Sequence, residues 1–240
     1  MLGLLRSLTR ARPRRYDLAV PRELRAIVFD LDGVLADSEG LHVQAWKRLF
    51  EGRGLPFEEL WALEWVGVPD VEIPARLARQ FSARDGAAAL VAEKRKRFRS
   101  LVSAGLQPFP GVAAELEQCA ARSLPMAIGT SSARAEAALM LRVIGFQHYF
   151  PVVVAGDDVP RVKPAPDVYL EAARQLGTAP EQCVALEDSP GGIAAARAAG
   201  MRVHAVSTSF PRERLGEAKE VCAEPAEAIR RLRSLVNPAG

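Results

Sequence analysis

The sequence predicts an α/β fold in which helices cover both faces of a parallel sheet and a helical segment is inserted after the first strand. Two observations carry this prediction. From residue 111 to residue 206, short apolar runs alternate with helical patterns, which is typical of a parallel sheet. An earlier apolar run at residues 25–31 is followed, up to about residue 107, by helical patterns and no convincing strand. A chain of 240 residues is long enough for a core with one small inserted subdomain.

The insert follows the first strand, which is predicted at residues 25–31. Its helices are expected where apolar residues recur at 3.6-residue spacing, at residues 41–50, 56–66, 70–81 and 83–103. A linker rich in proline and glycine, residues 106–111, then returns the chain to the sheet. We therefore expect a helical cap subdomain at residues 37–108, and a core made of residues 23–36 and 109–240.

The core continues with alternating helices and strands. The expected helices are 111–122, 132–144, 166–176 and 190–199, and the expected strands are 126–130, 151–155, 183–187 and 202–206. The tail, residues 211–235, is predicted to be helical and to pack on the outside. In sheets of this kind, catalytic and ligand-binding residues lie in the loops that follow the carboxyl ends of the strands.

Composition excludes several classes of protein. Apolar residues make up 49% and charged residues 25% of the chain, as in ordinary globular proteins, and a net charge of +3 is too small to indicate nucleic acid or membrane as a partner. No apolar run approaches the ~18 residues of a membrane helix. The three cysteines are far apart, without a CxxC pair, which argues against disulfides and zinc and favours a reducing, cytoplasmic location. We expect a monomer or weak dimer, with Cys183 in the core.

The first 22 residues differ from the rest of the chain. They carry several arginines and no acidic residue before Asp17. Such a segment is typical either of a solvated basic extension or of an organelle transit peptide, and both interpretations stay open.

Two acidic residues follow the first apolar run, and a glycine comes next. If the strand continues, Asp30 and Asp32 point in the same direction and repel each other. Two buried negative charges must be compensated by a positive charge, and a bound divalent cation is the usual one. The alternative is a strand end followed by an ordinary Asp-Gly turn.

Polar residues also follow the later strands. Thr130, Ser131 and Ser132 bring hydroxyls and free amides to the start of a helix, where an anion is stabilised, although Ser132 can equally be a simple helix cap. Lys163 lies between prolines in a stiff turn that would orient its side chain. Glu187 and Asp188 end a buried strand, and hard oxygen ligands of this kind suit Mg²⁺.

The Glu187-Asp188 pair is followed by Ser189 and Pro190, which are expected to be the N-cap and first residue of the next helix.

These four segments, in this order, resemble the motifs of the haloacid dehalogenase (HAD) superfamily. Residues 30–38 match DxDGxxxDS, Thr130 matches the second motif, residues 163–167 match KPxPD, and residues 187–188 match the acidic fourth motif. The resemblance covers about residues 25–207 and implies a Rossmann-like core with an inserted helical cap. Within the superfamily the chain resembles the β-phosphoglucomutase/phosphoglycolate phosphatase-like (CbbY-like) group.

The resemblance also implies a role for each matched residue. Asp30 would attack a phosphoryl group and form an aspartyl-phosphate, and Asp32 would be the general acid and base. Lys163 would neutralise the charge shared by nucleophile and phosphoryl group, and Thr130, with Ser131 beside it, would bind that group. Mg²⁺ would be held by Asp30, the backbone carbonyl of Asp32, and Asp188. Glu187 would be an alternative ligand or support the others.

The cap would select the substrate, a small-molecule phosphate ester. His42 and Lys94 match cap residues of this group. His42 would contact the substrate or assist Asp32, and the alternative is an ordinary histidine on the helix surface. For Lys94, the alternative is that it belongs to a solvated basic face of its helix. The β-phosphoglucomutases of this group have an arginine that binds the distal phosphate of a bisphosphate. This chain has Asp70 at the matching place, and a carboxylate would repel phosphate. A sugar-phosphate or phosphoglycolate phosphatase is therefore expected, with a phosphosugar mutase and a regulatory protein on this scaffold as alternatives.

Overall fold

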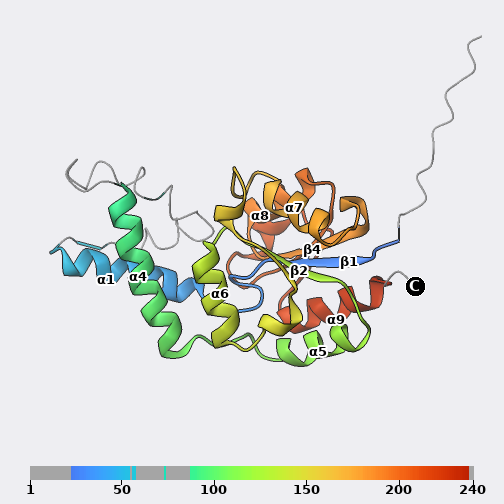
Figure 1. The fold of residues 1–240 in the computed structure, drawn as a ribbon, viewed down its shortest axis with the longest axis horizontal. Coiled ribbons are helices and arrows are strands. Elements are labelled where there is room, and N and C mark those ends of the chain that lie inside the picture. Colours follow the sequence, from blue (N-terminus) through green and yellow to red (C-terminus); the bar gives the residue numbers. More distant parts are fainter. Residues whose placement is uncertain (1–22, 55, 58–72, 74–86, 238–240) are drawn as a thin grey trace, which may run out of the picture.

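A six-stranded parallel sheet forms the centre of the protein (Figure 1). The computed structural model describes residues 23–54, 56–57, 73 and 87–237. The sheet order is β3-β2-β1-β4-β5-β6. The strands are β1 (Ala26–Phe29), β2 (Met126–Gly129), β3 (Val152–Val154), β4 (Cys183–Glu187), β5 (Arg202–Val206) and β6 (Glu220–Cys222). The predicted fold class is confirmed.

Helices cover both faces of the sheet because the side chains of each strand alternate between two cores. In β1, Ala26 and Val28 belong to the core under α7 (Asp167–Gln175) and α8 (Pro190–Ala198). Ile27 and Phe29 belong to the opposite core, under α5 (Val112–Ala121) and α9 (Pro225–Leu235). Figure 1 shows these helix pairs above and below the sheet.

Three more helices lie toward the carboxyl end of β1 (Figure 1). Helix α1 (Glu39–Gly52) packs against α4 (Ala87–Gly105), and α4 also contacts α6 (Arg134–Val143). A small third core contains residues of α1 and α4 together with Ile73. The connection from the sheet into α1 and the connection from α4 back to the sheet lie side by side, because Ala36 and Pro108 form an antiparallel bridge.

The cap boundaries at residues 37 and 108 stay a prediction. Apart from residues 56, 57 and 73, the expected helices 56–66 and 70–81 lie outside the described residues, as do the start of helix 83–103, Asp70 and the basic extension 1–22.

The structure corrects two predicted elements. The first strand ends at Phe29 rather than at residue 31, because Leu31 accepts the amides of Leu35 and Ala36 in a turn. The tail is not helical throughout: a 3₁₀ turn (Arg212–Leu215) and the edge strand β6 precede α9. The sequence pattern missed β6 because its three residues, Glu-Val-Cys, begin with an acid and form no apolar run, unlike the Val-Val-Val of β3.

The three cysteines are free and buried, and Cys183 lies in the core on β4, as predicted. Within the described part of the chain, no helix combines the length and the apolar character needed to cross a membrane.

Candidate active site

The candidate site begins where β1 ends. All four residues of β1 are fully buried between β2 and β4, so the strand fixes the position of the next residue, Asp30. The Asp30 amide donates to the carbonyl of Leu186 at 2.9 Å, which ties Asp30 to the neighbouring strand. Asp30 as a whole residue is only 7% exposed. A carboxylate this deeply buried needs a partner or a cation.

Lys163 provides that partner. Its Nζ lies 2.5 Å from Asp30 Oδ1 and 2.6 Å from Glu187 Oε1. Although burial opposes it, the charges of Asp30 and Glu187 hold the pKa of Lys163 above its usual value, so the side chain is an ammonium. The predicted cation is therefore directed at the predicted nucleophile.

Glu187 holds Lys163 from the other side and is itself fully buried. Besides the ammonium, Oε1 accepts a hydrogen bond of 2.5 Å from the Tyr169 hydroxyl. Oε2 accepts from the Asp188 amide at 3.1 Å and from the Ser189 hydroxyl at 3.2 Å. The sequence left open whether Glu187 is a ligand or a support, and these contacts favour support.

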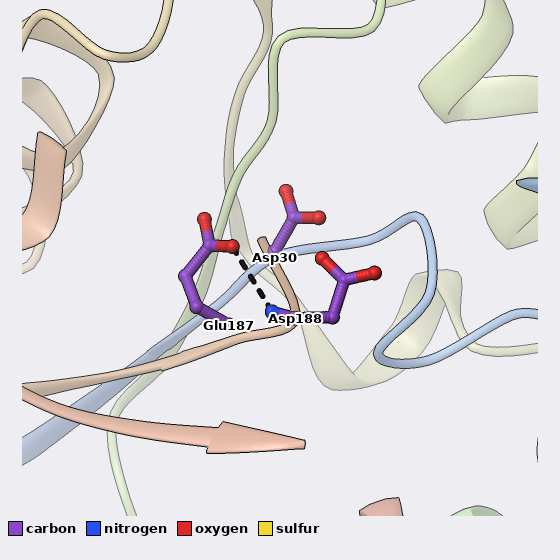
Figure 2. Close-up of side chains that lie close together, drawn as sticks. All are labelled: Asp30, Glu187 and Asp188. Carbon is purple, nitrogen blue, oxygen red and sulfur yellow. Dashed lines mark hydrogen bonds between the residues drawn. The ribbon is translucent and has the colours of Figure 1, made fainter. Parts of the chain in front are cut away.

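Three carboxylates, those of Asp30, Glu187 and Asp188, have oxygens within 4.8 Å of one another. Figure 2 shows them in a row at the ends of β1 and β4, with Asp30 between the other two in this view. Burial raises the pKa of Asp30 to about 8, although the charge of Lys163 acts in the opposite direction. Burial and the charge of Asp30 raise the pKa of Asp188 well above its ordinary value.

These residues fit a hard divalent cation. The one ammonium, Lys163, neutralises only part of the negative charge of three clustered carboxylates. The donor set is oxygen throughout, which is what Mg²⁺ prefers. A cation at this place would stabilise the ionised carboxylates against the burial and the mutual repulsion that raise the two aspartate pKa values.

Asp32 lies in a different environment from Asp30, and the strand that would have given the two side chains one direction ends at Phe29, before either acid. Its carboxylate accepts hydrogen bonds from Ser38 Oγ at 2.5 Å, Ser132 Oγ at 2.8 Å and His42 Nε2 at 3.2 Å. Burial acts in the opposite direction, but these bonds, that of His42 foremost, hold the pKa of Asp32 below its usual range. The two acids are thus separated in environment, and their pKa values are shifted in opposite directions.

His42 connects Asp32 with Lys94. The Lys94 Nζ lies 2.6 Å from His42 Nδ1, and because an ammonium only donates, Nδ1 is the acceptor and Nε2 carries the proton given to Asp32. The imidazole is stacked on Phe98, with ring centroids 3.9 Å apart. Lys94 is fully buried, so the interpretation as a solvated basic face is wrong for this residue.

The loop after β2 carries the predicted phosphate-binding residues. Thr130 is buried, and its Oγ1 accepts the Ser132 amide at 3.0 Å. Ser131 is half-buried beside it. The alternative of Ser132 as a helix cap is wrong: α6 begins at Arg134 with Ala133 as N-cap, and Ser132 donates to Asp32 instead. Ser189, by contrast, is confirmed as the N-cap of α8, accepting the Gly192 amide at 3.1 Å.

Sequence reasoning missed two kinds of contributor. Tyr169 lies inside a predicted helix, and no motif includes it. A tyrosine on the buried face of a helix nevertheless indicates that its hydroxyl has a hydrogen-bond partner in the core. Thr208 and Ser209 follow β5 and contact Gly33 and Asp188. They stand at the carboxyl end of a strand, the same signal that identified the other segments.

Comparison with known proteins agrees with this geometry. A family model described as haloacid dehalogenase-like hydrolase matches residues 27–206. Fructose-1-phosphate phosphatase YqaB of Escherichia coli is 38% identical over 175 residues, covering 73% of this chain and 92% of the relative. A phosphorylated carbohydrates phosphatase of Thermotoga maritima is 34% identical over 188 residues, covering 78% and 87%.

Solved structures give the same result. CbbY from Rhodobacter sphaeroides in complex with phosphate is 30% identical with a TM-score of 0.77, covering 85% of this chain and 96% of the other. A putative β-phosphoglucomutase from Thermotoga maritima is 31% identical with a TM-score of 0.73, covering 89% and 100%. The chain therefore belongs to the haloacid dehalogenase-like hydrolase family.

Proposed function

We propose that the protein is a Mg²⁺-dependent phosphatase that hydrolyses a small phosphorylated metabolite, a sugar phosphate or phosphoglycolate, through an aspartyl-phosphate on Asp30. One observation carries the proposal: the buried Asp30 carboxylate lies 2.5 Å from the Lys163 ammonium and within a cluster of oxygen ligands. The family and the phosphatase names of the relatives support the reaction type. Three free, buried cysteines support action in the reducing cytoplasm.

Asp30, Asp188 and the backbone carbonyl of Asp32 would hold the metal ion. When bound, Mg²⁺ supplies positive charge to the phosphoryl oxygens and to the attacking carboxylate. Lys163 supplies a second positive charge, and Glu187 and Tyr169 keep it in position. Hydrogen-bond donors in the loop after β2, Thr130 and Ser131, complete the binding of the phosphoryl group.

The reaction then divides between the two acids of the first turn. An oxygen of Asp30 forms a bond to phosphorus while the ester bond to the leaving oxygen breaks, and Asp32 delivers a proton to that oxygen. In the second step Asp32 takes a proton from water, whose oxygen forms a bond to phosphorus while the bond between phosphorus and the Asp30 oxygen breaks; phosphate leaves and the Asp30 carboxylate is regenerated. Asp32 is ionised once it has given up its proton in the first step, and its hydrogen bonds with Ser38, Ser132 and His42 favour this form, which the second step needs because a base must be free of its proton.

A phosphosugar mutase is the second candidate, supported by the likeness to a putative β-phosphoglucomutase. Asp70 argues against it, since a carboxylate at this place of the sequence cannot bind a distal phosphate. The two reactions differ in their products. A mutase would need a bisphosphate activator and would release phosphate slowly, so rapid phosphate release from a monophosphate would exclude it.

A regulatory role on this scaffold is less well supported, because all of the catalytic acids are present.

The test is a phosphate-release screen over phosphorylated metabolites, with Mg²⁺ and with EDTA. Asp30→Asn should abolish turnover and leave the circular dichroism spectrum unchanged. Asp157→Asn, which changes an exposed acid in the short turn after β3, is the matched control and should keep full activity. Full activity of Asp30→Asn would rule out the proposed nucleophile.

A further inference from the structure

The loop after β5, residues 207–210, reaches across the candidate site and makes two contacts with it. The Thr208 hydroxyl donates to the backbone carbonyl of Gly33 at 2.5 Å. The Ser209 hydroxyl donates to Asp188 Oδ2. The family match ends at residue 206, so neither residue belongs to the segment that identified the family. The contacts join the turn after β1 to the loop after β4.

Gly33 shows how closely these segments meet. Its φ of +71° is a left-handed conformation that favours glycine. A Cβ at this position would lie 1.8 Å from Asp188 Oδ2 and 2.6 Å from Ser209 Oγ. The backbone of the first turn therefore packs directly against the Asp188 carboxylate and the hydroxyl that binds it.

Ser209 determines the orientation of the Asp188 carboxylate. A carboxylate has two oxygens in one plane, so a hydrogen bond that fixes Oδ2 also fixes the direction of Oδ1. Asp188 is 3% exposed, and its oxygens lie within reach of Asp30 and Glu187. Partners of this kind, which hold a metal-binding carboxylate from behind, contribute to metal affinity without touching the metal.

We propose that Ser209 is a positioning residue that orients Asp188 for Mg²⁺ and that Thr208 holds its loop against the first turn. This inference rests on the proposed metal-dependent function. It predicts that loss of the Ser209 hydroxyl weakens Mg²⁺ binding and leaves the metal-free fold intact. A hydroxyl that only ties two loops together would instead affect stability, with or without the metal.

The experiment compares two serines of the same loop. Ser207 is half-buried like Ser209, but its hydroxyl donates to the carbonyl of Cys222, at 3.4 Å, rather than to the site. Calorimetric titration with Mg²⁺ alone measures metal affinity without any substrate. Ser209→Ala should bind Mg²⁺ about 10-fold to 100-fold more weakly than the wild type, whereas Ser207→Ala should bind it normally.

Two further measurements separate positioning from structure. In EDTA, Ser209→Ala and the wild type should have the same melting temperature. With substrate, saturating Mg²⁺ should restore most of the kcat of Ser209→Ala, with KM unchanged. If the alanine variant does not fold, the near-isosteric pair Ser209→Thr and Ser209→Val replaces it, because only threonine keeps the hydroxyl and should keep the affinity.

The outcomes distinguish this inference from the proposed function. Wild-type affinity in Ser209→Ala, or in Ser209→Val, would overturn the positioning role and leave the phosphatase proposal standing. A wild-type protein that hydrolyses phosphate esters but binds no Mg²⁺ in the titration would overturn both the metal site and the role of Ser209.

Discussion

Replacing Gly192 with alanine should damage both stability and activity, even though alanine is the better helix former. Gly192 lies in the first turn of α8, directly beneath the Glu187 carboxylate. A Cβ there would lie 1.9 Å from Oε1, 2.0 Å from Cδ and 2.1 Å from Oε2 of Glu187. The carboxylate would have to move, and with it the acceptor that holds Lys163.

The size of the effect follows from the contacts that Glu187 would lose. Alanine in place of a helical glycine gains about 0.5–1 kcal/mol. Breaking a buried ion pair costs about 3–5 kcal/mol, and Glu187 is fully buried 2.6 Å from Lys163 Nζ. The net loss is about 3 kcal/mol, which lowers the melting temperature of a chain of this size by about 6–12 °C. Because Lys163 also touches the nucleophile, kcat should fall with stability.

The assay is thermal unfolding by circular dichroism, together with kcat for phosphate release. Gly191 offers a matched control, because it is the neighbouring residue of the same helix and a Cβ there would meet nothing within 4 Å. Gly191→Ala should therefore be as stable as the wild type or slightly more stable, and fully active. Equal melting temperatures and equal kcat for the two variants would refute the reasoning.

Two further predictions concern other buried groups. Tyr169→Phe keeps the aromatic ring but removes the hydroxyl that donates to Glu187, so kcat should fall about 10-fold with KM unchanged; steady-state kinetics with wild-type kcat would contradict this. The pKa of His204 is lowered to about 4, chiefly by burial and next by the positive charge of Arg202. These effects outweigh the carboxylate of Glu220, 3.5 Å from His204 Nδ1, which would raise the pKa. Neutral His204 thus stabilises the fold fully above pH 6.5 and loses this contribution as the pH falls toward 4. Between pH 4 and 6.5, the free energy of urea unfolding of His204→Leu should depend on pH less steeply than that of the wild type, by on the order of 1 kcal/mol per pH unit. An unchanged slope would contradict this prediction.

The strands and the residues that follow them could be predicted because both leave local patterns. Runs of mainly apolar residues mark β1, β2, β3, β4 and β5, and Asp30, Thr130 and Asp188 each stand directly after one of these strands. Parallel strands bring their carboxyl ends to one edge of the sheet, so polar residues at those ends meet. The edge strand β6, which has three residues, has no such pattern and was missed.

By itself the sequence determined the fold class, the family and the residues of the four motifs at the candidate site, because periodicity and motif order are properties of the chain alone. Only the tertiary structure decided how that group is divided. It turned Asp30 toward Lys163 and Asp32 toward Ser38, Ser132 and His42, because the first strand ends before either acid. It also brought Ser209 to Asp188 across 21 residues of sequence. Contacts of this kind depend on side-chain direction and on close packing between distant segments, which no spacing along the chain records.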